Sequence, residues 1–488
     1  MAKKLIIAEK PSVANDIARA LGGFTRHGDY FESDEHVLSS AIGHLLELVA
    51  PEGVEVKRGK WSFVNLPVIP PHFGLKPIER TEDRLKVLLK LLKRKDVTGV
   101  INACDAGREG ELIFRYIMQH AGNKKPIQRL WLQSMTQGAI REGFGALRSD
   151  KSMLPLADAA VCRSESDWLV GINGTRAMTA FNSKEGGFYK TTVGRVQTPT
   201  LAILVEREDR IRKFLSRDYW EVHAGFAAAA GAYSGRWFDE KFAKAAKDED
   251  AEARPERLWD AARAEALRKK CAGKPGIATE EAKPTTQISP LLFDLTSLQR
   301  EANGRFGFSA RTTLSLAQAL YEKHKVLTYP RTDARALPED YLPTVKSTME
   351  MLAGKARGKD RSEGVAAYAP FARQVLKEGW VKPSKRIFDN TKISDHFAII
   401  PTLQAPGHLS DAEAKLYDMV VKRFLAVFFP AAEFLVTTRI TRVEGEPFKS
   451  EGRVMVKPGW LAIYGRDTEK DDALMVAIGG GEKVKTTE

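Results

Sequence analysis

A tyrosine two residues before an arginine is the part of this sequence best suited to covalent chemistry. Residues 326–333 read Val-Leu-Thr-Tyr-Pro-Arg-Thr-Asp. A phenol has an ordinary pKa of about 10, so Tyr329 needs cationic neighbours and a proton acceptor before it can attack a phosphate. Pro330 favours an extended backbone, in which positions i and i+2 share a face, so we expect Arg331 beside the phenol. The alternative is a tyrosine at a strand end next to a solvated arginine.

A cluster of acidic residues follows a predicted strand at 99–103. Residues 104–111 read Cys-Asp-Ala-Gly-Arg-Glu-Gly-Glu and precede an apolar helical run. Carboxylates at the end of a strand suit a hard cation such as Mg²⁺, and Asp105 is the best-placed ligand. Glu9 follows the first predicted strand, 4–8, and parallel strands end at one edge of a sheet, so these two carboxylates are expected to converge. The alternative is a polar turn that caps a helix.

The chain as a whole is basic and has few cysteines. Its 488 residues include 76 Lys and Arg against 63 Asp and Glu, a net charge of +13, which suits a polyanionic partner such as nucleic acid. The three cysteines are odd in number and far apart, which argues against a disulfide framework. No apolar run reaches the roughly 18 residues that a membrane helix needs. We therefore expect a soluble, cytoplasmic protein.

The pattern along the chain predicts several domains. A chain of 488 residues exceeds one ordinary core. Short β-rich runs alternate with amphipathic helical segments at the start, as in a doubly wound α/β domain, and Ser12 is expected to cap the first helix. Residues 354–364 are expected to form a mobile loop. The predicted units are an α/β domain at 1–150, a helical part at 151–215, a β-rich arch at 216–289, a helical domain carrying the tyrosine at 290–404, and a return through the arch at 405–488.

Several separated motifs resemble those of one enzyme family, in the same order. The segment Thr328–Asp333 resembles the active-site segment of type IA DNA topoisomerases. Glu9 together with the acidic cluster resembles the Toprim domain of topoisomerases and primases, although Gly107 stands where the family commonly has a second aspartate. Within the family, the resemblance points to bacterial topoisomerase III. Further segments that are similar to the family are Arg163–Asn173, Thr192–Pro199 and Ile393–Thr402.

The resemblance implies a multidomain α/β and α-helical isomerase with an N-terminal Toprim domain, helical domains and a β-rich arch. Such an enzyme cleaves and rejoins one DNA strand through a 5′-phosphotyrosyl intermediate, with Mg²⁺, and so relaxes negatively supercoiled DNA. It needs no ATP, in agreement with the lack of a phosphate-binding Gly-x-x-x-x-Gly-Lys-Ser/Thr loop. The implied catalytic residues are Tyr329, Arg331, Glu9, Lys10 and His396. The implied metal ligands are Glu9, Asp105, Glu109 and Glu111. Because Gly107 removes one ligand, either Glu109 or Glu111 compensates for it or the site holds its ion more weakly.

Two helical segments and one tryptophan are implied to hold the DNA strand. Arginines and neutral polar groups there suit a sugar–phosphate backbone, and Gly194 allows close backbone approach. Ordinary alternatives remain for these positions: Arg163 and Asp167 form an ion pair within one helix, worth about 0.2–0.5 kcal/mol, and Trp61 packs instead of stacking on a base. The implied DNA-binding residues are Thr192, Val193, Gly194, Arg195, Val196, Gln197, Arg163, Asp167, Arg176 and Trp61.

The resemblance ends before the family pattern does. It runs from Glu9 to about Gly459, whereas the family continues with a Pro-Pro segment, a helical portion and a Gly-x-Gly-Thr-x-Ala-Thr-Arg motif. We therefore expect a C-terminally incomplete chain, either a fragment or a naturally short protein. The first hypothesis is an active topoisomerase that relaxes and decatenates DNA. Its rivals are a catalytically weak or inactive fragment that binds single-stranded DNA, and a primase, which would not need Tyr329 with Arg331.

Overall fold

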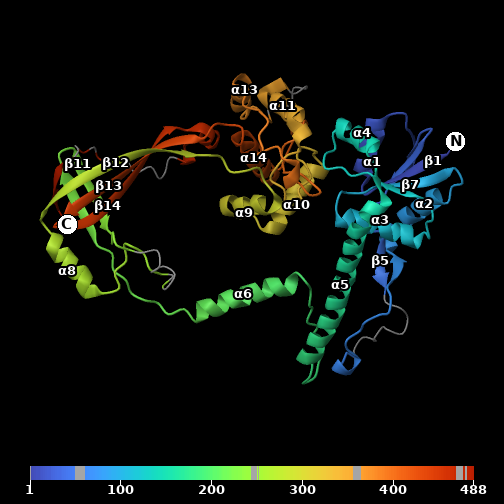
Figure 1. Cartoon of the computed structure of the whole chain (residues 1–488), viewed down its shortest axis with the longest axis horizontal. Coiled ribbons are helices and arrows are strands. Elements are labelled where there is room, and N and C mark those ends of the chain that lie inside the picture. Colours follow the sequence, from blue (N-terminus) through green and yellow to red (C-terminus); the bar gives the residue numbers. More distant parts are fainter. Residues whose placement is uncertain are drawn as a thin grey trace.

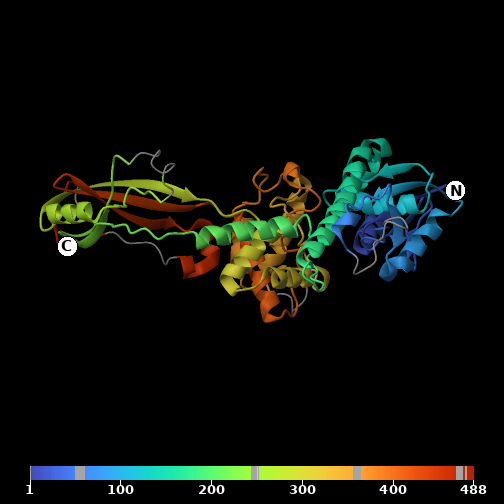
Figure 2. The same cartoon turned by 90° about the horizontal axis from the view of Figure 1, so that it is seen from below.

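The computed structural model describes residues 2–49, 61–242, 250, 252–355, 364–468, 476, 478 and 481–487. Its elements follow one another around a ring: an α/β unit and a long helix on one side, a helix along the bottom, a β-barrel at the far end and a group of helices along the top (Figure 1). From below, the α/β unit and the barrel lie at opposite ends of an elongated molecule (Figure 2). The loop expected at 354–364 falls mostly outside the described residues.

The N-terminal unit is built on one mixed sheet with strand order β2-β3-β4-β1-β7-β8-β9. The central strand β1 is parallel to β4 on one side and to β7 on the other. The strands are β1 (Lys3–Ala8), β2 (Thr25–His27), β3 (Tyr30–Glu32), β4 (His36–Ser40), β7 (Val97–Ala103), β8 (Ile127–Arg129) and β9 (Arg148–Ser149). The helices are α1 (Pro11–Leu21), α2 (Glu82–Leu92), α3 (Arg108–His120) and α4 (Gln137–Gly145), and β5 (Leu46–Val49) pairs with β6 (Gly74–Pro77).

Helices cover both faces of this sheet, which confirms the predicted doubly wound domain. Side chains alternate along β1 because successive residues of a strand point to opposite faces. Leu5 and Ile7 lie in the core shared with α2 and α3, whereas Ile6 and Ala8 lie in the core shared with α1 and α4. From Leu5 to Ala8 the strand is therefore buried on both sides, and the polar residues Glu9 and Lys10 follow directly at its carboxyl end.

The start of α1 differs from the prediction. Lys10 occupies the position before the helix with an extended backbone, Pro11 is the first helical residue, and no side chain caps this end. Proline suits the first helical position because that residue has no intrahelical partner for its N–H. Ser12 therefore lies inside the helix, and the prediction that it caps the helix was wrong.

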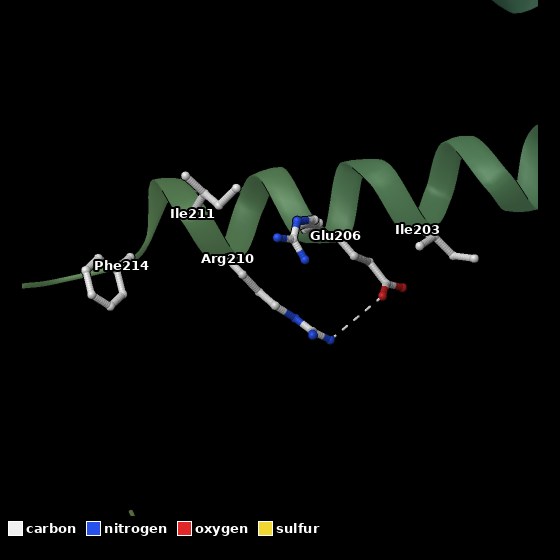
Figure 3. Close-up of a pocket in the computed structure, with 6 residues that line it drawn as sticks. Ile203, Glu206, Arg210, Ile211 and Phe214 are labelled. Carbon is white, nitrogen blue, oxygen red and sulfur yellow. Dashed lines mark ion pairs between the residues drawn. The ribbon is translucent and has the colours of Figure 1, made fainter. Parts of the chain in front are cut away.

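Two long helices lead away from the α/β unit. α5 (Asp150–Asn182) packs on α3, and the chain then turns back along α5 before α6 (Gln197–Arg212) begins. Gly174 permits this close return, since a Cβ there would lie 2.6 Å from Val193 Cγ1. No residue of α6 is buried. Figure 3 shows its exposed side chains, with Glu206 and Arg210 paired at 4.0 Å between apolar residues. No helix in the described part of the chain is long and apolar enough to span a membrane.

The β-rich arch is a closed barrel with strand order β10-β11-β14-β13-β12-β15. Phe226, Trp237 and Phe448 fill its core together with residues of α8. It is assembled from two parts of the chain that are separated by the helical unit: β10 (His223–Ala228), β11 (Gly231–Trp237), α8 (Ala261–Cys271) and β12 (Pro275–Gln287) from the first, and β13 (Ala432–Val443), β14 (Glu446–Lys457) and β15 (Lys483–Thr486) from the second.

The tyrosine-bearing unit contains the largest apolar core of the described residues. Its helices are α9 (Leu295–Phe306), α10 (Ala310–Glu322), α11 (Leu342–Glu350), α13 (Ala369–Lys377) and α14 (Asp411–Ala426). Leu416, Val420 and Phe424 of α14 are fully buried in this core. The predicted boundary at 404 is therefore wrong, because α14 belongs to the helical unit and the return to the barrel begins with β13.

Candidate active site

The carboxyl ends of β1 and β7 bring Glu9 and Asp105 together. The Asp105 backbone N–H donates to Glu9 Oε2 at 3.3 Å. Lys10 Nζ lies 2.6 Å from Asp105 Oδ2 and 3.5 Å from Glu9 Oε1, so one ammonium is shared by two carboxylates. Glu9 is 8% exposed. The convergence expected from the parallel strands is thus present in the structure.

A buried arginine holds the loop that carries Asp105. Arg129 Nη1 donates to the carbonyl of Cys104 and Nη2 donates to the carbonyl of Asp105, both at 2.7 Å. Gly110 brings α3 close to the same loop, since a Cβ there would lie 2.8 Å from the backbone nitrogen of Asp105. The backbone of Asp105 is therefore positioned by the Arg129 side chain of β8 and by the close approach of α3.

The structure does not present Glu111 to the site. Its carboxylate is fully buried and accepts hydrogen bonds from Arg115 at 2.8 Å and Asn102 at 2.9 Å, and Arg129 Nε lies 3.4 Å away. A carboxylate with these partners neutralises Arg129 and is not free to hold a metal, which corrects the expectation that Glu111 compensates for Gly107. Glu109 is exposed and pairs with His44.

Replacing Glu111 by glutamine is expected to destabilise the N-terminal unit by about 3 kcal/mol, because it leaves the buried Arg129 charge without a counterion. Urea unfolding followed by circular dichroism measures this loss. Divalent-cation affinity at the site is expected to stay unchanged. Unaltered stability with weaker cation binding would instead make Glu111 a metal ligand.

Tyr329 reaches this edge from the other unit of the protein. Its segment is tied to residues 398–401: Thr328 N donates to the carbonyl of Ile400 and Thr328 Oγ1 donates to that of Ala398, both at 3.0 Å. Lys10 Nζ lies 4.5 Å from the centroid of the Tyr329 ring. The phenol therefore lies on a hydrogen-bonded segment, next to the cation that the two carboxylates share.

His396 completes the contact between the two units. Its ring centroid lies 4.3 Å from that of Tyr329, and its Nε2 lies 3.4 Å from Asp105 Oδ2. Thr332 Oγ1 donates to the backbone carbonyl of His396 at 2.8 Å, which fixes its position relative to the tyrosine segment. Of the residues expected in catalysis and metal binding, the structure brings together Glu9, Lys10, Asp105, Tyr329 and His396.

The two carboxylates of this site differ in electrostatic environment. Burial, and then the negative charge of Asp105, raise the pKa of Glu9 above its ordinary value. Burial also acts to raise the pKa of Asp105, but the hydrogen bond from His396 and the charge of Lys10 outweigh it and lower that pKa to about 2. Carboxyl groups whose pKa values move apart suit different tasks: Glu9 favours holding a proton and Asp105 favours holding a positive charge.

Arg331 is placed differently from the prediction. Its side chain is exposed, and its Nε donates to Gln318 Oε1 on α10 at 3.4 Å. The expectation that it lies beside the phenol is therefore not confirmed. Gln318 had no signal in the sequence that would have linked it to this arginine.

An ion pair joins the start of α6 to α5. Arg195 Nη2 donates to Asp167 Oδ2 at 3.1 Å, and both side chains remain more than two-fifths exposed. Asp167 thus pairs across two segments and not with Arg163 in its own helix, which corrects the intrahelical alternative. A Cβ at Gly194 would meet nothing within 4 Å. The exposed neighbours on this segment are Thr192, Val196 and Gln197, whereas Val193 is half-buried.

Arg176 and Trp61 lie close together beside this segment, and both have buried side-chain nitrogens. Arg176 is only 8% exposed, and its Nε and Nη1, like Trp61 Nε1, have no hydrogen-bond partner in the described structure. Its guanidinium lies 5.8 Å from the Trp61 ring centroid, and that ring lies 5.4 Å from Phe188. Trp61 therefore packs against other side chains, as its ordinary alternative predicted.

Asp395 is a residue of the site that sequence reasoning missed. It precedes His396, and its carboxylate lies against the backbone of Gly107 in the acidic loop. Burial raises the pKa of Asp395. The sequence shows a glycine at position 107, where the family commonly has an aspartate, and it shows an aspartate next to His396. Only the fold shows that Gly107 and Asp395 are in contact.

Family models match the two parts of the chain that form this site. A model described as DNA topoisomerase matches residues 151–488, which is more than half of the chain, and a Toprim domain model matches residues 4–135. The chain belongs to the type IA DNA topoisomerase family. Its Toprim domain is thus the α/β unit that holds Glu9 and Asp105.

Individual curated members of the family are similar to this chain in sequence. The chain is 41% identical over 478 residues to DNA topoisomerase 3 of Bacillus subtilis (strain 168), a match that covers 97% of this chain and 61% of that protein. It is 39% identical to DNA topoisomerase 3 of Shouchella clausii, covering 99% and 63%. The chain therefore spans about three fifths of the length of these curated relatives.

A solved structure shares the fold of this chain. The full-length topoisomerase I from Thermotoga maritima superimposes with a TM-score of 0.60 at 20% sequence identity, covering 99% of this chain and 70% of that one. The arrangement of Toprim domain, helical units and barrel, predicted from the resemblance, is therefore confirmed as a type IA topoisomerase fold.

The Toprim domain is a metal-binding domain, and its residues here suit a hard cation. In the described ranges, no group of three or more His, Cys, Asp or Glu side chains is arranged to hold a metal. Glu9 and Asp105 nonetheless share one cation, the Lys10 ammonium, and present oxygen donors, which Mg²⁺ prefers. The donor set at the ends of β1 and β7 therefore fits this ion.

Proposed function

We propose that this chain cleaves and rejoins one strand of DNA through Tyr329, as the catalytic part of a type IA topoisomerase. One observation carries the proposal: the ring of Tyr329 lies 4.5 Å from the Lys10 ammonium, which also pairs with the Asp105 carboxylate. A nucleophile from one unit and a charge-stabilising edge from another meet at one point, although Tyr329 lies more than three hundred positions from Lys10 and more than two hundred from Asp105 in the sequence.

In the proposed reaction, Tyr329 Oη attacks a phosphodiester, its proton passes to water, and the bond from phosphorus to the 3′-oxygen breaks. Glu9 donates its proton to the leaving 3′-oxygen and takes one back on rejoining, a role that its raised pKa supports. Lys10 and His396 stabilise the negative charge that develops on the phosphate. The phosphotyrosyl ester conserves the energy of the broken bond, so rejoining needs no nucleotide.

Mg²⁺ is the cation we assign to the Toprim edge, held by Asp105 and Glu9. When bound there, it supplies positive charge that positions phosphate oxygens and the 3′ end. The segment from Thr192 to Gln197, which includes Arg195, is proposed as a path for the DNA strand together with Arg163 and Asp167 of α5. Arg176 offers unused hydrogen-bond donors near it. Relaxation of negatively supercoiled DNA, and decatenation, follow if strand passage accompanies this cleavage. In a bacterium, such work on DNA takes place in the cytoplasm.

The polarity of the covalent link tests this proposal. A single-stranded oligonucleotide carrying a 3′ label is incubated with the protein and Mg²⁺ and then denatured. We expect the label to migrate with the protein, whereas a 5′ label should leave on a shorter strand that ends in a 3′-hydroxyl.

Binding of the oligonucleotide without any adduct would support the inactive DNA-binding fragment instead. Incorporation of ribonucleotides would support a primase. An adduct that carries the 5′ label would contradict the proposed chemistry.

A further inference from the structure

Glycine at position 107 is not demanded by the backbone. Gly107 lies just before the first residue of α3 with φ −161° and ψ −179°, an extended conformation that any residue adopts. The reason for a glycine here must therefore be sought in the space around it and not in its dihedral angles.

That space is filled by a carboxylate from the tyrosine-bearing unit. A Cβ built on Gly107 would lie 2.5 Å from Asp395 Cγ and would collide with both carboxylate oxygens. Asp395 thus occupies the position at which a side chain of residue 107 would begin. The acidic loop therefore has a carboxylate next to position 107, and this carboxylate belongs to the tyrosine-bearing unit.

The Asp395 carboxylate has no hydrogen-bond donor or ion-pair partner in the described parts of the chain. It is half-buried, and the charges that act on it are those of Asp105 and Asp333, which repel it, and those of His396 and Arg108, which attract it. Lys10 is engaged by Asp105 and Glu9. Asp105 and Asp395 repel each other, and Asp395 has no cation of its own. An additional cation between them would therefore stabilise both carboxylates.

We propose that Asp395 supplies, from the tyrosine-bearing unit, the second aspartate ligand of the cation site in the Toprim domain. This inference rests on the proposed function only in taking Mg²⁺ as the ion of that site. Because Asp105 and Asp395 belong to different units, an ion held by both ties the Toprim domain to the tyrosine-bearing unit. The bound ion therefore favours the closed arrangement in which Tyr329 meets Lys10.

Cation affinity tests the ligand role without DNA and without activity. Mn²⁺, which has a spectroscopic signal, is titrated into the full chain and the free ion is measured by electron paramagnetic resonance. Asp395→Asn, which keeps the size of the side chain, is expected to weaken Mn²⁺ binding about tenfold or more. The matched control is Asp333→Asn, which removes a nearby charge on an exposed side chain that accepts from Ser394; this control should change affinity less than about threefold.

Moving the carboxylate back to the Toprim side gives a second test. The double variant Gly107→Asp/Asp395→Ala is expected to bind Mn²⁺ within about threefold of the unmodified chain. Closure is read from a fluorophore pair on Lys90→Cys and Lys377→Cys, in α2 and α13, with Cys162→Ser. Mn²⁺ should shorten the distance between the fluorophores in the otherwise unmodified chain, whereas in the double variant the ion should bind without shortening it.

The proposal is overturned by any of three results: Asp395→Asn binds Mn²⁺ as well as the unmodified chain, Asp333→Asn weakens binding as much as Asp395→Asn, or the double variant still closes with Mn²⁺. Failure of the proposed function has a separate signature, since no phosphotyrosyl adduct would form in the unmodified chain whatever its affinity for Mn²⁺. Each variant is checked for an unchanged circular dichroism spectrum.

Discussion

The variant Tyr329→Phe is expected to form no covalent protein–DNA adduct, a loss of at least about 10³-fold relative to the unmodified chain. Phenylalanine keeps the ring that packs 4.3 Å from His396 and 4.5 Å from Lys10, so the two units should still meet. Only the attacking oxygen is removed. Denaturing electrophoresis of the protein with a labelled oligonucleotide measures the adduct, and affinity for the same oligonucleotide should change little.

A second phenol in the site provides the matched control. The Tyr321 ring lies 5.4 Å from that of Tyr329, on α10, and is half-buried. Tyr321→Phe removes a hydroxyl from the same neighbourhood and is expected to leave adduct formation within about threefold of the unmodified rate, because phenylalanine keeps the edge-to-face ring contact with Tyr329 and the proposed reaction uses no oxygen of residue 321. Equal losses in both variants would mean that Tyr329 is not the specific nucleophile.

Replacing Lys10 by methionine is expected to slow cleavage by about 10²–10³-fold, the usual effect of removing one group that stabilises the charge of a transition state. Methionine keeps much of the length of the side chain but removes the ammonium that lies 2.6 Å from Asp105 and 4.5 Å from the Tyr329 ring. Single-turnover adduct formation measures the rate. A rate within twofold of the unmodified chain, at unchanged DNA affinity, would exclude Lys10 from the chemistry.

The Lys10→Met variant is also expected to change the pH dependence of the cleavage rate. Glu9 acts as a proton donor in its neutral form, so its contribution is complete below its pKa and is lost as pH rises through that pKa. Burial and Asp105 raise the pKa of Glu9, whereas Lys10 lowers it. Removing Lys10 should therefore raise this pKa further and move the alkaline decline of the cleavage rate to higher pH. A move to lower pH would contradict the assigned role of Glu9.

Local sequence patterns were sufficient to find the main parts of this site. Buried runs followed by Glu9 and by Asp105 predicted two parallel strands that end at one edge, and their carboxylates do converge there. Motif resemblance added what periodicity does not contain, namely that Tyr329 and His396 belong to the same site as that edge. Their positions follow from the packing of whole units.

The predictions that were wrong concern features that depend on tertiary packing. Ser12 looked like a helix cap, but Pro11 starts the helix one residue earlier. Glu111 looked like a metal ligand because spacing along the chain does not reveal that its side chain turns inward to Arg129. Asp395 was overlooked because its meaning depends on a contact with Gly107, almost three hundred residues away, which no local pattern encodes.

The site of covalent attachment tests the central claim most directly. The protein–DNA adduct is digested with nuclease and protease, and the peptide that keeps a nucleotide is sequenced by mass spectrometry. We predict a 5′-phosphate ester on Tyr329 in the peptide Val-Leu-Thr-Tyr-Pro-Arg. A nucleotide on any other residue, or a link through a 3′-phosphate, would contradict the meeting of the phenol with the Toprim edge as the centre of catalysis.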